Sequence, residues 1–356
     1  MAPSESVPST VLVTGGAGFI GSHACVELLD HGYEVIVVDD YSNSTPQVLA
    51  RVERLAGRFV GAVYELDIRD RRALSAVFER HPVDAVVHFA AHTSVSGSTR
   101  LPVQYYDNNV GGTTALLHTM HEHGVHQLVF SSSCSVYGDA DHGPLDEGTP
   151  PRPTNPYAAS KWLCEQVLAD VCRHHPEYTV MCLRYFNPTG AHPSGLLGED
   201  PRGEPDHLMP SMAQVAVGRR ERLRVFGVDY PTPDGTAIRD YIHVMDTVHA
   251  HRVALDHLTD APGMHVYNLG RGSGSSVLEV IAAFSEACGR AVPYEIAPRR
   301  PGDVAELVAD LSAVERAWGW RPTLGLADMC RDAWRFQHLN PGGYAGSARW
   351  PKPEEE

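Results

Sequence analysis

Basic residues are scarce in this sequence. Among its 356 residues, 29 lysines and arginines stand against 44 aspartates and glutamates, which gives a net charge of −15. Proteins that bind nucleic acid need a basic face to neutralise phosphate groups, so the charge argues against nucleic acid as a partner. An anionic substrate would have to be held by a few local arginines.

Cysteine is also sparse, and long apolar runs are lacking. The seven cysteines are odd in number, scattered and free of C-x-x-C spacing, which fits reduced thiols in a cytoplasm. No run approaches the roughly 20 apolar residues of a membrane span, and residues 1–9 lack the basic and apolar regions of a signal peptide. We therefore expect a cytoplasmic protein without a membrane partner, with a disordered lead at 1–9 and a loose tail at 341–356.

A glycine-rich turn follows the first strand pattern. Residues 10–14 form a short apolar, β-branched run typical of a buried parallel strand, and a helical pattern begins at Ser22. Strand, glycine turn and helix in this order form a dinucleotide-binding fingerprint, because the glycines let the backbone approach a pyrophosphate that the helix N-terminus then binds. The candidate cofactor-binding residues of this turn are Gly15, Gly18, Phe19, Ile20 and Gly21.

An acidic residue closes the second strand pattern. The apolar run 34–38 ends at Asp39, followed by Asp40. An acid roughly 20 residues past the glycines can bind the ribose hydroxyls of an adenosine and repel a 2′-phosphate. Asp39 therefore favours NAD over NADP as the cofactor. The alternative for Asp39 is a turn or cap residue.

Tyr157 and Lys161 lie four residues apart in a helical pattern, so their side chains share one face. A free phenol has a pKa of roughly 10, too high for a base at neutral pH. An ammonium group about 5 Å away favours the phenolate by roughly 3 kcal/mol at an effective dielectric constant near 20, and a nicotinamide cation acts in the same direction. We therefore predict that Lys161 lowers the pKa of Tyr157, which then removes a hydroxyl proton while hydride leaves the same carbon. Read with Ser133 upstream, Tyr157 and Lys161 are the candidate catalytic residues; the alternative is chance spacing on a surface helix.

Strand and helix patterns alternate through the first half of the chain. They predict strands at 62–66, 85–89 and 127–130 and helices at 71–80 and 101–122. This alternation predicts an α/β fold with a doubly wound parallel (Rossmann) sheet, whose ligands bind beyond the carboxyl ends of the strands. Gly, Pro and Asp become frequent from 187 to 235. We expect an NAD-binding domain at 10–186, with about 238–265 packing back on it, and a smaller C-terminal α/β substrate domain at 187–340.

With these residues placed, the chain resembles the extended short-chain dehydrogenase/reductase superfamily, and within it the UDP-glucose 4-epimerases. The resemblance runs from about Val11 to Asn340. It rests on the motifs at 131–138 (Ser-Ser-Ser-Cys-Ser-Val-Tyr-Gly), 183–192, 235–244, 267–270 and 300–304 (Arg-Pro-Gly-Asp-Val).

The resemblance implies roles for individual residues. Tyr157 matches the family's base, Lys161 the residue that holds the nicotinamide ribose, and Ser133 the serine that relays the proton of the sugar 4-hydroxyl. Further NAD-binding residues implied by the resemblance are Asp67, Ile68, Phe89, Ala90, Asn108 and Tyr185. The implied substrate-binding residues, besides Ser133 and Tyr157, are Asn187, His207, Phe226 (a stacking residue for uracil), Arg239, Arg300, Asp303 and Leu307.

The activity implied by the resemblance is the interconversion of UDP-galactose and UDP-glucose. The sugar is oxidised transiently at C4, the 4-keto sugar rotates, and hydride returns to its opposite face. NAD is regenerated in each turnover and stays tightly bound. A homodimer joined by a helix bundle is implied as well, since the predicted helices at 101–122 and 157–173 are apolar on more than one face.

Three alternatives to this function differ in the residues they require. Dehydratases and decarboxylases that act on sugar nucleotides carry an acid directly before the Val-Tyr-Gly triplet, where this chain has Cys134 and Ser135, so elimination is disfavoured. A non-catalytic NAD-binding protein would tolerate loss of Tyr157 or Lys161, yet both are present. A 4-epimerase with another main substrate, the UDP-GlcNAc/UDP-GalNAc pair or a uronate or pentose, remains open.

Some positions depart from the family pattern. Thr93 stands where many members have a lysine near the NAD phosphates, and His207 stands where an asparagine often contacts substrate. His207 would make substrate binding sensitive to pH. A tyrosine at the position of Leu307 is associated with exclusion of N-acetylated sugars and a small residue with their acceptance. With leucine, we expect good activity on UDP-galactose and UDP-glucose and weaker activity on the N-acetyl pair.

The sequence contains 20 histidines, but we predict no metal site. The histidines at 118, 121, 123 and 126 cluster along the chain, as do those at 243, 249, 251 and 257. The first group lies at a predicted helix end with no thiolate or carboxylate to match, and the implied chemistry needs no metal. Solvated histidines or interface contacts are the simpler interpretation.

Overall fold

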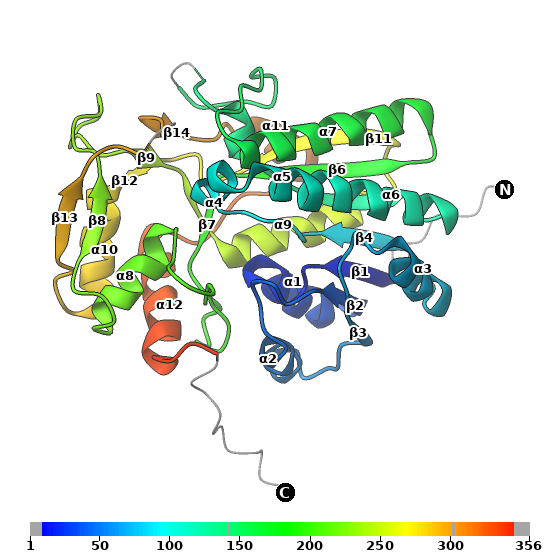
Figure 1. Cartoon of the computed structure of the whole chain (residues 1–356), viewed down its shortest axis with the longest axis horizontal. Coiled ribbons are helices and arrows are strands. Elements are labelled where there is room, and N and C mark those ends of the chain that lie inside the picture. The colour runs from blue at the N-terminus through cyan, green and yellow to red at the C-terminus, as the bar shows by residue number, and fades with distance from the viewer. Residues whose placement is uncertain (1–8, 141–142, 301–302, 345–356) are drawn as a thin grey trace, which may run out of the picture.

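Seven parallel strands form the central sheet of the computed structural model, which describes residues 9–140, 143–300 and 303–344. Their order is β3-β2-β1-β4-β5-β6-β11 (Figure 1). The chain order reverses between β1 and β4, which makes this the topological switch point where doubly wound sheets bind ligands. The strands are β1 (Thr10–Thr14), β2 (Glu34–Asp39), β3 (Ala62–Glu65), β4 (Ala85–His88), β5 (Gln127–Ser133), β6 (Thr179–Tyr185) and β11 (Gly263–Leu269).

Helices cover both faces of this sheet, because successive strand residues point to opposite sides. Val11 and Val13 of β1 pack into one core with α1, α2 and α9, whereas Leu12 packs into the other core with α3, α6 and α7. The predicted Rossmann fold class is confirmed. The helices are α1 (Phe19–Asp30), α2 (Gln47–Ala56), α3 (Arg71–Arg80), α6 (Gly112–Glu122), α7 (Pro156–His174) and α9 (Val244–Asp256).

The helix predicted at 101–122 is interrupted. It consists of α5 (Pro102–Tyr105), a π-helical turn η1 (Tyr106–Gly111) and α6. A π-helical turn inserts one extra residue into the helix and is common at functional sites. Here it buries two successive side chains, Asn108 and Asn109, beside the carboxyl end of the sheet. Just before it, α4 (Val95–Arg100) follows the loop that leaves β4.

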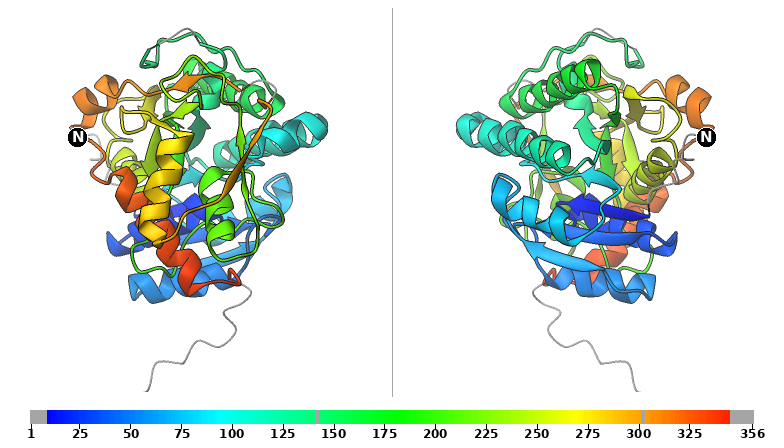
Figure 2. Two further views of the ribbon diagram at one scale, coloured as in Figure 1. Left: turned by 90° about the vertical axis from the view of Figure 1, so that its left-hand side faces the viewer. Right: turned by 90° about the vertical axis from the view of Figure 1, so that its right-hand side faces the viewer.

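The C-terminal elements form a separate apolar core. The helices α8 (Leu208–Ala216), α10 (Val277–Cys288) and α12 (Leu326–Leu339) enclose it, and α10 and α12 lie side by side in the left view of Figure 2. Their short strands are β7 (Asn187–Thr189) with β10 (Tyr241–His243), β8 (Leu223–Phe226) with β13 (Tyr294–Ala297), and β9 (Ile238–Arg239) between β12 (Ser275–Ser276) and β14 (Glu306–Leu307). The remaining elements are the short 3₁₀ turn η2 (Cys134–Tyr137) and α11 (Ser312–Trp318).

The predicted lead and tail lie mostly outside the described residues. Of the tail, residues 341–344 are described, and Tyr344 is buried with its hydroxyl donating to the carbonyl of Gly198 at 2.8 Å. Across the described part of the chain, every helix is too short or too polar to cross a bilayer.

Candidate active site

A cavity of about 990 Å³ lies beyond the carboxyl ends of the central strands, facing the C-terminal elements. It is lined by the glycine turn after β1, by the ends of β2 to β6, and by residues of β8, β9 and β14. The structure brings all the predicted site residues together here: Gly15, Gly18, Phe19, Ile20, Gly21, Asp39, Asp67, Ile68, Phe89, Ala90, Asn108, Ser133, Tyr157, Lys161, Tyr185, Asn187, His207, Phe226, Arg239, Arg300, Asp303 and Leu307.

The glycine turn leaves no room for side chains. Gly15 has a left-handed φ of +69°, and a Cβ added to it would lie 2.8 Å from the backbone nitrogen of Ala90. A Cβ on Gly21 would lie 2.1 Å from the carbonyl oxygen of Gly15. The backbone of β1, the loop after β4 and the start of α1 are therefore in direct contact. The first turn of α1 lacks a side-chain cap and lines the cavity, which fits the binding of a pyrophosphate.

Asp39 lies at the end of β2, beside this turn. Its carboxylate accepts hydrogen bonds from the backbone nitrogens of Ala17 and Tyr41, both at 2.9 Å, and from the Ser44 hydroxyl at 2.7 Å. These bonds fix the carboxylate at the cavity wall, although burial raises the pKa of Asp39. A buried acid held against the glycine turn fits the adenosine ribose of NAD, so the residues present fit this cofactor.

Asn109, next to the predicted Asn108, positions the loop after β4 at the cofactor end of the cavity. Its side-chain oxygen accepts from the backbone nitrogen of His92 at 2.8 Å, and its amide nitrogen donates to the His92 carbonyl at 3.0 Å and to Ser160 at 2.9 Å. It thereby ties the loop containing Thr93 to α7. Asn108, which was predicted, lines the cavity, whereas Asn109 does not; an Asn-Asn pair in a helical pattern gives no indication that the second side chain holds a neighbouring loop.

Ser133, Tyr157 and Lys161 meet where β5 ends and α7 begins. The side chain of Asn155 caps α7 by accepting from the nitrogen of Ala158 at 2.9 Å, and Pro156 takes the first helical position, a favoured start. Tyr157 thus lies in the first turn of α7 and Lys161 one turn later. The Lys161 ammonium donates to the carbonyl oxygen of Ser131 at 2.7 Å.

The predicted effect of Lys161 on the pKa of Tyr157 is wrong for the protein alone. Burial raises the pKa of Tyr157 to about 12, and a hydrogen bond with Ser133 offsets only part of that rise. Lys161 is itself buried, and burial lowers its pKa to about 8. The prediction compared two solvated groups at close range. In the structure, loss of water around each group is the largest cause of its pKa shift.

The substrate end of the cavity carries both predicted arginines. Arg239 forms an ion pair with Asp303, and the guanidinium carbon of Arg300 lies 4.1 Å from the ring centroid of Phe226. Across the described residues, the side-chain oxygen of Asn187 is buried without a hydrogen-bond partner. A buried polar atom on a cavity wall is costly unless a ligand satisfies it, which fits a substrate-binding role for Asn187.

His207 is paired with a residue that the sequence analysis missed. Its Nδ1 lies 2.5 Å from a carboxylate oxygen of Glu199, which also lines the cavity. The Glu199 charge raises the pKa of His207. The two residues come from the irregular segment between β7 and α8, where neither helical nor strand spacing could have paired them.

Comparisons with known proteins agree with this geometry. The model of the NAD dependent epimerase/dehydratase family matches residues 11–270. The UDP-glucose 4-epimerase of Bacillus subtilis (strain 168) is 49% identical over 334 residues, covering 94% of this chain and 98% of that protein; the Yersinia pestis enzyme is 50% identical over 335 residues, covering 94% and 99%. The crystal structure of UDP-glucose 4-epimerase from Bifidobacterium longum in complex with NAD⁺ and UDP superposes with a TM-score of 0.91 at 50% identity, covering 94% of this chain and 99% of that one. The chain therefore belongs to the NAD dependent epimerase/dehydratase family and, within it, to the UDP-glucose 4-epimerases.

Proposed function

We propose that this protein interconverts UDP-galactose and UDP-glucose by inverting C4 of the sugar, with NAD kept bound through each turnover. One observation carries the proposal: a single cavity is lined by the glycine turn and Asp39, by Ser133, Tyr157 and Lys161, and by the arginine-containing substrate end. Cofactor, proton-transfer groups and sugar nucleotide would therefore share one cavity.

Ser133 and Tyr157 are the proposed proton-transfer pair. The hydrogen bond between them links the phenol to the serine hydroxyl, so a proton from the sugar 4-hydroxyl can reach the Tyr157 oxygen directly or through Ser133. When bound, NAD supplies the acceptor and donor of hydride at the sugar carbon, and its oxidised ring carries a positive charge. Lys161, anchored on the Ser131 carbonyl, lies on the same helix face as Tyr157 and would hold the nicotinamide ribose, while the positive charge of the oxidised ring would favour the phenolate.

Inversion requires that the sugar present both faces to the same groups. We propose that the nucleotide stays fixed while the sugar turns. Arg239 and Arg300 are suited to the diphosphate because a guanidinium group binds phosphate oxygens in a bidentate manner. The ion pair with Asp303 holds Arg239 in place. The guanidinium group of Arg300 lies over the ring of Phe226, which supports it. Asn187 would bind the sugar nucleotide with its unpartnered oxygen.

We also propose a homodimer formed by the α5–η1–α6 segment and α7, which are packed together and run side by side in Figure 1. Large apolar side chains are exposed there: Leu101, Val103, Tyr106 and Leu163. Burying them against a second copy would remove them from water. The variant Val103→Glu should convert a dimer to a monomer in light scattering. A wild-type monomer at working concentration would contradict this interface.

Two further assignments belong to this proposal. Residues 10–186, with about 238–265, would form the cofactor domain, and 187–340 the substrate domain. In support, α9 and β11 pack against the central sheet and its helices, whereas α8, α10 and α12 share their own core. The seven cysteines are all free, which supports work in the reducing cytoplasm.

The test uses purified protein with UDP-galactose and no added NAD. We expect UDP-glucose to form, which would establish both the epimerisation and a retained cofactor. The variant Tyr157→Phe is the matched control: it should keep its NAD and its fold but lose at least about 100-fold in kcat, the usual worth of a general base. If wild type does not convert this pair even with NAD supplied, the proposal fails.

A further inference from the structure

A group of three possible metal ligands lies at the opposite end of the molecule from the cavity. His121 is on the last turn of α6, His175 caps the end of α7, and Glu177 precedes β6. These segments meet at the amino ends of β5 and β6, where the backbone nitrogen of Thr179 donates to the carbonyl of His126 at 3.0 Å. The cavity lies beyond the carboxyl ends of the same strands, so the two regions are separate.

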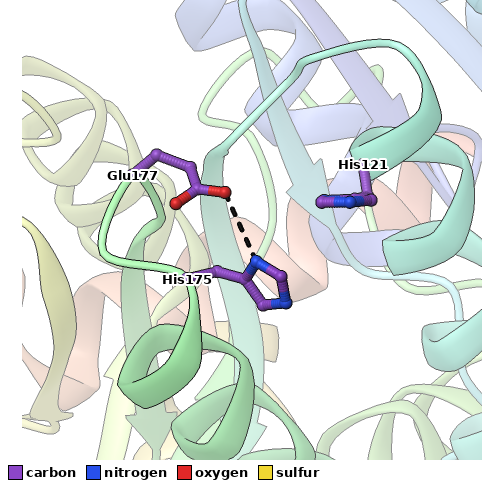
Figure 3. A group of neighbouring side chains, drawn as sticks. All are labelled: His121, His175 and Glu177. Carbon is purple, nitrogen blue, oxygen red and sulfur yellow. Dashed lines mark ion pairs between the residues drawn. The ribbon is translucent and has the colours of Figure 1, made fainter.

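The ligand atoms of these three residues lie within 4.8 Å of one another (Figure 3). His175 Nδ1 is 3.4 Å from a carboxylate oxygen of Glu177, the ion pair dashed in Figure 3. His175 and Glu177, separated by one residue, provide a short chelating loop, and His121 approaches from a different helix. Small rotations of exposed side chains would bring all three to the distances of roughly 2.0–2.2 Å that zinc requires.

A buried aromatic ring restricts where the two imidazoles can lie. Tyr178 is 1% exposed. The ring of His121 stacks over it at 6.4 Å between centroids, and the ring of His175 meets its edge at 6.2 Å. The two imidazoles themselves are 5.1 Å apart. The nitrogen ligands are therefore partly positioned before any ion arrives, which lowers the entropic cost of binding.

We propose that His121, His175 and Glu177 bind a divalent transition-metal ion, with Zn²⁺ the best match, and that a water molecule completes the tetrahedron. Two imidazoles and one carboxylate suit zinc, whereas Mg²⁺ prefers oxygen ligands alone. The ion would tie the end of α6 to the turn between α7 and β6. Its role is structural, because the site is remote from the cavity.

This proposal revises the sequence-based interpretation of these histidines. That interpretation found no carboxylate to accompany the histidines around residue 121. The structure supplies Glu177 and a second histidine from the far end of α7, a segment that sequence spacing alone does not bring near α6. His118 and His123, the neighbours of His121 in the sequence, are not part of the group.

The experiment titrates chelator-treated holoenzyme with Zn²⁺ alone, and in parallel with Mg²⁺, by calorimetry and thermal unfolding. We expect one Zn²⁺ per chain and a thermal midpoint that rises with the logarithm of zinc concentration above the dissociation constant, with no response to Mg²⁺. His121→Asn and His175→Asn should each weaken Zn²⁺ binding at least about tenfold, the lower end for loss of a metal-site contact. His174→Asn, an exposed histidine adjacent to the site, is the matched control and should bind like wild type.

Two further measurements distinguish loss of the metal site from unfolding of the variants and from an effect of Zn²⁺ on catalysis. Equal thermal midpoints of the metal-free variants and the metal-free wild type would show that the substitutions leave the fold intact, and the rate on UDP-galactose should be the same with and without Zn²⁺. Absence of Zn²⁺ binding by wild type, or equal binding by wild type and His121→Asn, would overturn the proposal. Equal binding would place the ion on other side chains.

Discussion

Arg184 and Glu165 form a bidentate ion pair in the interior, behind the proposed catalytic residues. The Nη2 and Nε atoms of Arg184 lie 2.6 and 3.0 Å from the two carboxylate oxygens of Glu165, and the side chains are 4% and 1% exposed. Ser132 also donates to Glu165, at 2.5 Å. Glu165 is one helical turn beyond Lys161, Arg184 is on β6, and Ser132 directly precedes Ser133 on β5. The ion pair therefore ties α7 to β6, and the Ser132 hydrogen bond ties it to the end of β5.

Removing one partner of this pair should be strongly destabilising. Glu165→Gln leaves the Arg184 charge buried and uncompensated, which typically costs about 3–5 kcal/mol of unfolding free energy. The exposed pair between Arg71 and Glu122 is the control, and Glu122→Gln should cost no more than about 1 kcal/mol. Denaturant unfolding measures both. Similar small losses of unfolding free energy in the two variants would show that the buried pair stabilises the fold no more than the exposed pair does.

The glycine turn gives a prediction about cofactor retention. A Cβ at Gly21 would lie 2.1 Å from the backbone oxygen of Gly15, whereas a Cβ at Gly148, outside the cavity lining, would lie 3.5 Å from its nearest neighbour. Gly21→Ala must therefore displace backbone, and we expect it to lose NAD during purification. Gly148→Ala is the control and should retain its NAD. NAD released by denaturation can be quantified by absorbance. A Gly21→Ala protein with a full complement of NAD would contradict this account of the turn.

The buried Lys161 predicts how stability depends on pH. Its pKa is about 8 in the folded protein, below the ordinary value of 10.5. Between these two pH values the unfolded chain binds more protons at this residue than the folded protein does. Lys161 therefore opposes folding below about pH 8, and this penalty is relieved as pH rises toward 10.5. The difference in unfolding free energy between wild type and Lys161→Met should move in favour of wild type from pH 8 to pH 10. A difference that stays constant with pH would exclude the lowered pKa.

The residues predicted for the cofactor end line one cavity, and there is a physical reason for this convergence. In a parallel sheet the carboxyl ends of the strands meet at one edge. Residues that follow strands, such as Asp39, Asp67, Phe89 and Ser133, must therefore converge if the strand assignments are correct. An error of a residue or two in the predicted ends of a strand does not change the edge of the sheet at which that strand ends. Gly15 and Asp39 therefore line the same cavity.

Pairings between distant or irregular segments could not be predicted in this way. Glu199 meets His207 inside a segment without periodicity, and Glu177 meets His121 only because α6 and α7 end at the same level. The pKa of Tyr157 was predicted in the wrong direction because burial depends on the whole fold. The π-helical turn at 106–111 was missed because its amphipathic pattern differs little from that of an α-helix.

His207 predicts a pH dependence of substrate binding. Glu199 raises its pKa above the ordinary 6.5, so the imidazole keeps its charge to a higher pH than a free histidine and loses it as pH rises through the raised value. If His207 faces the diphosphate, KM for UDP-galactose should increase over that rise, while kcat stays level. His207→Asn, which restores the family's usual residue, should remove this dependence. A wild-type KM that does not change from pH 6 to pH 9 would show that His207 makes no charged contact with substrate.

Leu307 predicts the choice of sugar. It lies on β14, is paired in register with Arg239 of β9, and is packed beside Cys134 and Phe186 at the substrate end of the cavity. The larger Leu307→Tyr side chain should take the volume that an N-acetyl group needs, and reduce kcat/KM for UDP-GalNAc about tenfold or more, while UDP-galactose changes little. Leu307→Ser should shift the ratio in the opposite direction. Kinetics on both substrates for the three proteins test this directly. If wild type uses both pairs equally and neither substitution alters the ratio, another residue sets the size of the sugar site.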